Sequence, residues 1–315
     1  MIKKKISVVS PVYNESLGLT HFHSEISKII DSLKSYSVKI YFIDDGSTDD
    51  SLIKLKNIAS VDSRVEIVSL ARNFGKEIAT TAGLHIAEGD AIIIIDSDSQ
   101  HPVELIPEFI KRWEEGSDVV IGVRTENQKE GLLKKIGSSL FYSLLNKIGV
   151  KNIIKGSTDF RIIDRSVVME FNKLTEHSRI TRALIDWLGY SRSTIEFKAN
   201  PRIHGQATYS TKKLFQLAFD SFISLSFTPL YFVGYIGMII MLLSSLMAIL
   251  MLIEKYILSD FLSLNFSGTA ILALLIIFLV GIILSCQGIL SLYIARIYTE
   301  VQNRPLYIIK KSSRK

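Results

Sequence analysis

The first two-thirds of the chain alternates short apolar runs with stretches of helical periodicity. Ala91–Ile95 is apolar without interruption, which is typical of a strand buried on both faces. Phe22, Ile26 and Ile30 recur at helical spacing, and a further helix is predicted over residues 76–87. Four other strand-like runs are KISVVSPVY, KIYFIDDGS, RVEIVSLARN and DVVIGVR. This order of strands and helices predicts an α/β fold, in which helices cover both faces of a mostly parallel, Rossmann-like sheet.

Two long apolar stretches follow this alternating part. Residues 227–253 and 261–295 contain no charged side chain, and each exceeds the ~20 helical residues that cross a bilayer. The short connection between them carries Glu254, Lys255 and Asp260, so a C-terminal two-helix transmembrane hairpin is predicted. The alternative is a pair of buried helices in a soluble protein, which stretches of this length disfavour.

Basic residues flank the outer ends of the predicted hairpin, with Lys212 and Lys213 before it and Arg296, Arg304 and Lys310 after it. The positive-inside rule then places both ends, and the N-terminal part, in the cytoplasm. The predicted segments are a catalytic domain over 1–210, an interfacial helix over 211–226, membrane spans over 227–253 and 267–295, and a basic tail over 296–315. The N-terminus MIKKKISVVS leads directly into a strand pattern, so no signal peptide is expected.

Composition adds two constraints. The formal net charge is +6, but the basic residues gather beside the apolar stretches and no nucleic-acid-binding module is recognisable. Attraction to an anionic membrane surface accounts for this charge, so a membrane and not a nucleic acid is the expected partner. The single cysteine, Cys286, lies inside the second apolar stretch, so no disulfide is expected.

Polar residues gather where each predicted strand ends. Because the C-terminal ends of parallel strands meet at one edge of a sheet, this edge is the expected ligand site. Each cluster alone also fits turn and helix-cap chemistry, but five of them on one edge favour a binding site. The clusters are Tyr13, Asn14 and Glu15; Asp44, Asp45, Gly46 and Ser47; Arg72 and Asn73; Asp96 and Asp98; and Arg124.

Asp96 and Asp98 form the most informative of these clusters. In an extended chain, residues two apart face the same way at a spacing of ~6–7 Å, so both carboxylates can reach one small ligand. Hard oxygen ligands, without cysteine or clustered histidine, favour Mg²⁺ or Mn²⁺ shared with substrate phosphates. The guanidinium of Arg124 is suited to hold a phosphate, with a solvated surface charge as the alternative.

Six motifs in order along the chain resemble those of one enzyme family. They are PVYNE at 11–15, DDGSTD at 44–49, ARNFGK at 71–76, DSDSQHP at 96–102, GVR at 122–124 and STDFRIIDR at 157–165. The chain is similar along essentially its whole length to the polyprenyl-phosphate branch of glycosyltransferase family 2. That branch includes dolichol-phosphate mannose synthase and the bactoprenol (undecaprenyl-phosphate) glucosyltransferases.

The resemblance implies a GT-A catalytic domain that transfers a sugar, with inversion, from a nucleotide sugar to undecaprenyl or another polyprenyl phosphate. The implied donor is a UDP-sugar such as UDP-glucose. The implied location is the cytoplasmic leaflet of the bacterial inner membrane, with a multi-pass, homo-tetrameric enzyme. The product would supply a cell-envelope glycan such as O-antigen or teichoic acid.

The resemblance also implies roles for particular residues. Asp159 would position the acceptor or the sugar, with a general base as the alternative. His101 replaces a usual aspartate of the family, so no role is carried over to it. Asn127 stands where relatives have a second arginine, for which Lys134 or Lys135 is a candidate substitute. Residues implied in nucleotide binding are Pro11, Tyr13, Glu15, Asp44, Asp45, Lys76 and Asp96, those in cation binding are Asp96, Asp98 and Gln100, and those near the diphosphate are Arg202 and His204.

Two other functions fit parts of the sequence. A processive polysaccharide synthase usually carries a Q-x-x-R-W motif, whereas Arg112 and Trp113 lack the glutamine and lie too early in the chain. A catalytically inactive membrane scaffold on the same fold would not need the pair Asp96 and Asp98, and it would not need Asp159 or Arg124 either. The sequence therefore favours a sugar transferase.

Overall fold

A computed structural model describes residues 3–125, 154, 156–177, 179–200, 246, 253 and 268–310. The chain divides into two compact units, of which the first comprises Met1–Ser210 with Arg304–Lys315 and the second comprises Thr211–Asn303. The expected interfacial helix, Lys134, Lys135, Arg202, His204 and nearly all of the first predicted span lie outside the described residues.

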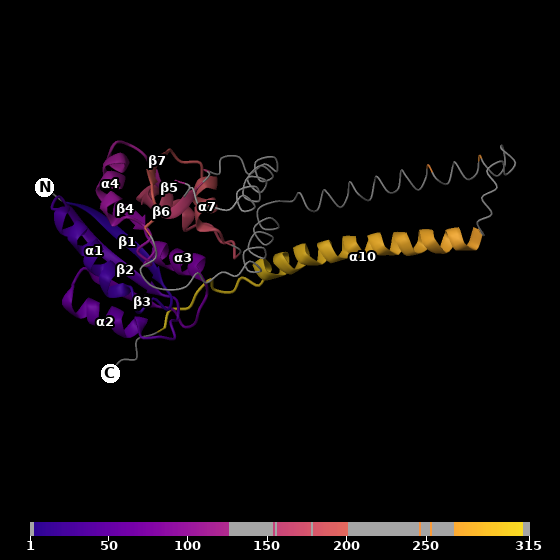
Figure 1. Cartoon of the computed structure of the whole chain (residues 1–315), viewed down its shortest axis with the longest axis horizontal. Helices are drawn as coiled ribbons and strands as arrows, with labels where there is room; N and C mark the ends of the chain where they lie inside the picture. Colours follow the sequence, from indigo (N-terminus) through magenta and orange to yellow (C-terminus); the bar gives the residue numbers. More distant parts are fainter. Residues whose placement is uncertain are drawn as a thin grey trace. The chain divides into compact units, whose positions relative to one another are not determined.

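The first unit is built on one seven-stranded sheet with the strand order β3-β2-β1-β4-β6-β5-β7 (Figure 1). The strands are β1 (Lys4–Val12), β2 (Tyr36–Asp44), β3 (Val65–Ser69), β4 (Ala91–Ile94), β5 (Val119–Arg124), β6 (Ser157–Asp164) and β7 (Arg192–Phe197). All the pairings are parallel except those of β6, which runs antiparallel to both β4 and β5. The predicted α/β fold with a mostly parallel sheet is confirmed.

Helices cover both faces of this sheet, because most of its strands carry buried apolar side chains on both sides. They are α1 (Leu19–Ser32), α2 (Ser51–Val61), α3 (Lys76–Ile86), the short 3₁₀ helix η1 (Val103–Leu105), α4 (Ile106–Glu114), α6 (Arg165–Phe171) and α7 (Thr181–Trp187). One core contains buried residues of α1, α2 and α4, such as Phe22, Leu55 and Phe109. The second core contains residues of α3, α6 and α7, such as Leu84 and Ile185. The unit is therefore a three-layer α/β/α sandwich.

Helix α3 lies unusually close to the sheet. Its buried side is formed almost entirely of small residues, and a Cβ added to Gly83 would come within 2.3 Å of Val9 Cγ1 in β1. Such a clash would force the helix away from the strand, because a packed core has no spare volume. The absence of a side chain at Gly83 thus brings α3, and Lys76 at its first turn, close to the sheet.

The C-terminal segment Arg304–Lys310 returns to the first unit and pairs with the end of β3. Leu70 and Ile309 form an antiparallel bridge. The amide of Ala71 donates to the carbonyl of Ile308 at 2.8 Å, and the amide of Lys310 donates to the carbonyl of Ser69 at 2.8 Å. The Tyr307 hydroxyl lies 3.2 Å from Nδ1 of His85 in α3. This segment therefore covers an otherwise open edge of the sheet.

The second unit is described chiefly by α10 (Gly268–Val301), a helix of 34 residues. It begins one residue after the expected start of the second span and continues beyond residue 295, where that span was predicted to end. Within the described part of the chain, no helix meets the combined length and hydropathy needed to cross a membrane.

Candidate functional site

The C-terminal edge of the sheet brings two distant carboxylates together. Ile94 of β4 pairs with Arg161 of the antiparallel β6. Asp96 follows Ile94 by two residues, and Asp159 precedes Arg161 by two residues. Because the strands are antiparallel, this register places Asp96 and Asp159 opposite each other. Lys76 Nζ lies between them, 2.8 Å from Asp96 Oδ2 and 2.7 Å from Asp159 Oδ2. The first turn of α3 thus places the positive charge of Lys76 between Asp96 and Asp159.

Electrostatics hold Asp159 and Lys76 in their charged forms. Burial opposes ionisation of Asp159, but the charge and hydrogen bond of Lys76 outweigh it and set the pKa of Asp159 at about 2. Burial also opposes the charge of Lys76, but the two carboxylates raise its pKa well above the ordinary value. At neutral pH Asp159 is therefore a carboxylate and Lys76 an ammonium group.

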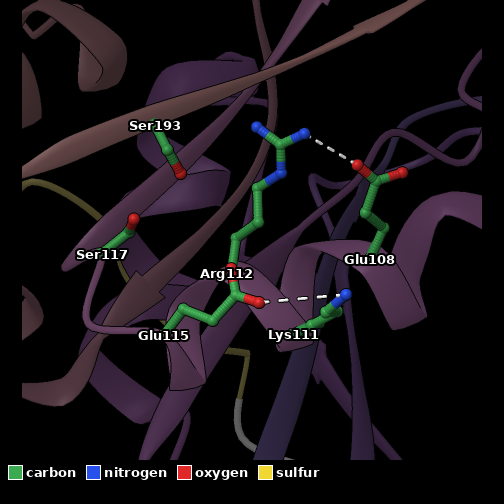
Figure 2. A pocket seen from close by; sticks show the side chains of 6 residues that line it. All are labelled: Glu108, Lys111, Arg112, Glu115, Ser117 and Ser193. Atoms are coloured by element: carbon green, nitrogen blue, oxygen red, sulfur yellow. Dashed lines mark hydrogen bonds and ion pairs between the residues drawn. The ribbon is translucent and has the colours of Figure 1, made fainter.

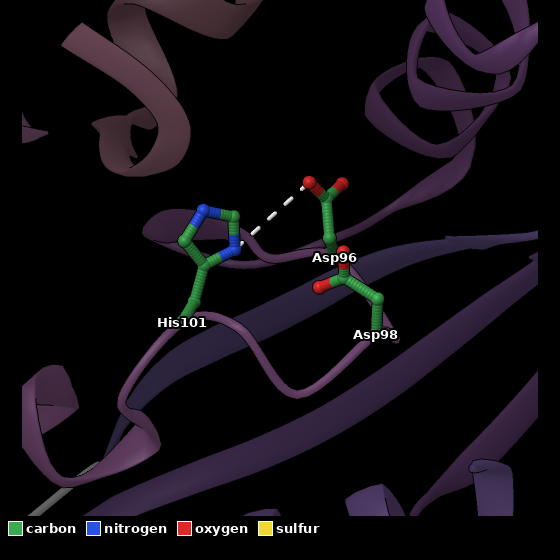
Figure 3. Close-up of side chains that lie close together, drawn as sticks. All are labelled: Asp96, Asp98 and His101. Atoms are coloured by element: carbon green, nitrogen blue, oxygen red, sulfur yellow. Dashed lines mark ion pairs between the residues drawn. The ribbon is translucent and has the colours of Figure 1, made fainter. Parts of the chain in front are cut away.

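Asp98 and His101 lie beside Asp96 in the turn after β4 (Figure 3). One potential ligand atom from each of the three residues lies within 4.8 Å of the others. The amide of Gln100 donates to Asp98 Oδ1 at 3.1 Å, and its carbonyl accepts from the amide of Asn200 at 3.0 Å, so this turn is held from both sides. Burial lowers the pKa of His101, so its ring is neutral at pH 7.

The residues present fit a divalent cation. Asp96 Oδ1 and His101 Nδ1 are buried atoms without a hydrogen-bond partner in the described structure. Buried polar atoms are normally satisfied, and each that is not costs ~1–3 kcal/mol. Two carboxylates and a neutral imidazole form a donor set used for divalent metals.

The predicted nucleotide-binding acids of β2 are buried and hydrogen-bonded to neighbouring loops. Asp44 accepts from the amide of Ser47 at 3.1 Å and from the hydroxyl of Ser69 at 2.8 Å. Asp45 accepts from the amides of Phe74 and Gly75, both at 2.8 Å. Burial raises the pKa of Asp45, and the two amides oppose that rise. Asp45 thus fixes the loop that leads into α3.

The loops after β1 and β2 are joined at the same edge. The amide of Asn14 donates to the Ser47 hydroxyl at 3.1 Å, and the side-chain oxygen of Asn14 accepts from the amide of Thr48 at 2.8 Å. Pro11 is buried in β1, whereas the ring of Tyr13 is 45% exposed. The amide of Glu15 donates to the hydroxyl of Ser51 at 2.9 Å. These contacts present the Tyr13 ring on a fixed loop.

Arg124 is exposed at the last position of β5, which runs parallel to β4 and therefore ends at the same edge. Its amide donates to the carbonyl of Gly156 at 2.9 Å, so its backbone position is fixed. The other predicted phosphate-binding residues, Lys134, Lys135 and Arg202, lie outside the described residues.

Sequence reasoning missed two residues. No role was assigned to His101 from the sequence, and a metal site of clustered histidines was excluded. The imidazole ring of His101 nevertheless lies next to Asp96 and Asp98. Arg161 was quoted within a motif only, yet it is fully buried two residues from Asp159 on the same face of β6. Its Nη2 donates to the carbonyl of Thr158 at 2.9 Å, and its Nη1 lies 3.7 Å from Asp186 Oδ1. No local pattern identifies either residue, because polar side chains interrupt the apolar run of β6 and His101 lies in the turn after β4.

A surface hollow is lined by residues of α4 together with Glu115, Ser117 and Ser193 (Figure 2). It involves Ser117, just before β5, so it lies toward the opposite edge of the sheet. Its charges pair with one another, with Arg112 Nη2 2.9 Å from Glu108 Oε1 and Lys111 Nζ 3.9 Å from Glu115 Oε1. The Ser193 hydroxyl is buried without a hydrogen-bond partner in the described structure, but the charged residues of this hollow are already paired.

The fold is shared with a nucleotide-binding enzyme of known structure. Glucosyl-3-phosphoglycerate synthase from Mycobacterium tuberculosis, crystallised with Mg²⁺ and uridine diphosphate, is similar with a TM-score of 0.51 and 22% identity, covering 70% of this chain and 78% of that chain. At this identity the likeness establishes the GT-A fold alone.

Relatives of known sequence align along almost the whole chain. The SfII prophage-derived bactoprenol glucosyl transferase of Shigella flexneri is 38% identical over 310 residues, covering 98% of this chain and 99% of that protein. A prophage bactoprenol glucosyl transferase homolog of Escherichia coli K12 is 36% identical over 307 residues, covering 98% and 99%. An uncharacterized glycosyltransferase of Bacillus subtilis strain 168 is 37% identical over 306 residues, covering 97% and 93%.

The family model for glycosyl transferase family 2 matches residues 7–171, which include most of β1, all of β2 to β6 and the whole Asp96 cluster. Because that match spans more than half of the chain and the relatives align along nearly all of it, this protein belongs to glycosyltransferase family 2.

Proposed function

We propose that this protein transfers a sugar, with inversion, from a nucleotide sugar to a polyprenyl phosphate at the cytoplasmic leaflet of a bacterial inner membrane. The observation that carries the proposal is the similarity to bactoprenol glucosyl transferases over 98% of the chain, which extends well beyond the matched catalytic family model. The proposed donor is a UDP-sugar such as UDP-glucose, and the acceptor is undecaprenyl phosphate. The lipid-linked sugar would supply a cell-envelope glycan such as O-antigen or teichoic acid.

The donor would bind where the loops after β1, β2 and β3 meet. The exposed ring of Tyr13 offers an apolar face to a nucleobase, while Asp44 and Asp45 fix the surrounding loops. Pro11 and Glu15 complete this proposed pocket. Lys76 is suited to approach the diphosphate, because its ammonium group already lies at the edge beside Asp96.

Asp96 and Asp98 would hold a Mg²⁺ or Mn²⁺ ion, with Gln100 completing the proposed set. When bound, the cation would stabilise the negative charge that develops on the departing nucleoside diphosphate. The unsatisfied Oδ1 atom of Asp96 supports this assignment. Lys76 would contribute a second positive charge to the same group.

Asp159 fits a positioning role better than that of a general base. Its pKa of about 2 makes it a weak proton acceptor while Lys76 is in place. The acceptor needs little deprotonation, because the second pKa of a phosphate monoester is ~6 and the group is mostly a dianion at pH 7. Arg124 would hold that dianion at the end of β5, together with Lys134 or Lys135, while Arg202 would approach the diphosphate of the donor. Asp159 would then orient the acceptor or the sugar hydroxyls.

A membrane hairpin would bring this site to its lipid. The uncharged residues 227–253 and 267–295 are the proposed spans, and 211–226 is the proposed interfacial helix. In α10, Leu272, Ile276 and Ile283 are exposed apolar side chains, which supports an apolar environment around this helix. A homo-tetramer is the proposed assembly.

The test is a transfer assay with full-length protein in membranes. Labelled UDP-glucose and undecaprenyl phosphate should yield an organic-extractable, acid-labile product that disappears with chelator and returns with Mg²⁺ or Mn²⁺. Asp98→Asn should abolish the product while the protein stays folded and membrane-bound, whereas Asp118→Asn, at the opposite edge of the sheet, should retain it. Water-soluble product alone, or indifference to chelator, would contradict the proposal.

A further inference from the structure

His101 is held rigidly beside Asp96 and Asp98. Its ring centroid lies 5.3 Å from that of Phe160 in β6 and 5.7 Å from that of Phe197 in β7. The residue is only 9% exposed. Two aromatic neighbours and near-complete burial leave the imidazole little freedom to turn, so the direction of Nδ1 is set by packing.

The direction of Nδ1 is toward Asp96 (Figure 3). Nδ1 lies 3.9 Å from Asp96 Oδ2, which is too long for a hydrogen bond. Nδ1 is buried without a hydrogen-bond partner in the described structure, and so is the other carboxylate oxygen, Asp96 Oδ1. Two unsatisfied polar atoms within one cluster of potential ligand atoms indicate a missing ligand that both residues can bind.

The chemistry of that guest follows from the donor atoms. Lys76 already donates to Asp96 Oδ2, so Oδ1 is the oxygen left for a further ligand. An anion would be repelled by Asp96 and Asp98, whereas a divalent cation is attracted by both. Mg²⁺ favours oxygen ligands, whereas an imidazole nitrogen suits later metals, and Mn²⁺ accepts both nitrogen and oxygen.

We propose that His101 Nδ1 is a direct ligand of the divalent cation, together with Asp96 and Asp98, and that this nitrogen shifts the preference of the site from Mg²⁺ toward Mn²⁺. The inference rests on the proposed cation-dependent transfer and adds a ligand to it. It also gives a physical reason for histidine at this position: the ring fills an aromatic pocket while its nitrogen faces the acids.

The experiment measures Mn²⁺ bound to the purified full-length protein in detergent, without substrate. Electron spin echo modulation of bound Mn²⁺ should show coupling to a directly bound ¹⁴N in the wild type. His101→Phe keeps the ring packing and removes the nitrogen, so the coupling should vanish and the Mn²⁺ affinity should fall ~10-fold or more. Mg²⁺ affinity, measured by competition, should fall less than ~3-fold because Mg²⁺ gains less from a nitrogen ligand.

Two further variants control this measurement. His101→Asn places an oxygen near the position of Nδ1, so it should lose the ¹⁴N coupling but bind Mn²⁺ more tightly than His101→Phe does. His21→Phe removes an exposed imidazole on α1, beside Glu25, and should leave both the coupling and the affinity unchanged. Thermal melting of each variant verifies that it is folded.

The outcomes separate this inference from the proposed function. Absence of ¹⁴N coupling in the wild type, or its persistence in His101→Phe, overturns the role of His101 even if lipid-linked sugar is still made with added metal. Failure to bind Mn²⁺ at all overturns the role of His101, whereas the proposed function is decided separately by the transfer assay with Mg²⁺ or Mn²⁺. A His101-dependent ¹⁴N coupling in a protein that makes no lipid-linked sugar upholds the ligand and rejects the proposed acceptor.

Discussion

Lys76 is the residue through which the first turn of α3 acts on the site. Its ammonium group contacts Asp96 and Asp159 at 2.8 Å and 2.7 Å, and the side chain is 42% exposed, so a ligand arriving at the edge can also reach it. Without this charge the two carboxylates would face each other at close range, which costs free energy in a partly desolvated site. Lys76 therefore balances the charge of the two carboxylates in the resting enzyme, and its proposed second role is to contact the diphosphate group of the donor.

Lys76→Met tests this role. We expect kcat/KM for lipid-linked sugar formation to fall ~10²–10³-fold, which is typical of losing one donor to a charged transition state. The melting temperature measured in chelator should also fall, because the repulsion between Asp96 and Asp159 is no longer balanced, and added Mn²⁺ should restore it.

Lys173→Met is the matched control for Lys76→Met, because Lys173 pairs with Glu170 on α6, away from the site. It should behave as wild type in both measurements. Wild-type turnover by Lys76→Met would show that the ammonium group only balances the charge of the two carboxylates in the resting enzyme and does not act on the donor.

At the scale of elements, the C-terminal segment Arg304–Lys310 stabilises the strand that leads into the donor loop. Its backbone bonds to Ser69 and Ala71 lie directly before the loop whose amides, at Phe74 and Gly75, bind Asp45. Tyr307 adds a contact to α3 through His85. The segment that follows α10 in sequence therefore contacts both the start of the connection between β3 and α3 and the last turn of α3.

Lys310→Pro and Lys310→Ala separate the backbone bond from the side chain. Proline removes the amide that donates to Ser69, whereas alanine keeps it. We expect hydrogen exchange at Ala71 to speed up ~3–10-fold in the proline variant, as for the loss of a bond worth ~1 kcal/mol, and donor affinity to weaken. Lys310→Ala should leave both unchanged, and equal exchange in the two variants would refute the coupling.

At the scale of the whole molecule, the two long uncharged stretches decide the topology we propose. A hairpin places its two outer ends on one side, so the catalytic unit and the returning C-terminal segment would share the cytoplasmic face. The polar connection at 254–260 would then face the opposite side.

Single cysteines in a Cys286→Ser background test this topology. An impermeant maleimide should label Met169→Cys, whose native side chain is 54% exposed in α6, only in inverted membrane vesicles. Ser259→Cys, in the connection, should react only from the outside of intact cells. The Cys286→Ser parent should not react, and labelling of both positions from the same side would exclude the hairpin.

Local sequence was sufficient for the strands with strong apolar runs. β1, β2, β4 and β5 were predicted because their side chains are buried on both faces, and α3 because its pattern is regular. β6 was not recognised as a strand, because Ser157, Thr158, Asp159 and Arg161 interrupt its apolar pattern. Those polar residues are the part of β6 that reaches the site.

The sequence by itself determined the fold class and predicted the edge of the sheet at which a ligand would bind and the acids that lie there, because strand periodicity and the polar residues after each strand can be read from the local sequence. Only the tertiary structure decided which groups meet at that edge. The antiparallel register of β6 sets Asp159 opposite Asp96, Gly83 brings α3 close enough to place Lys76 between them, and two aromatic rings aim His101 at the same acids. These placements depend on contacts between residues far apart in the chain, which packing fixes and local pattern does not.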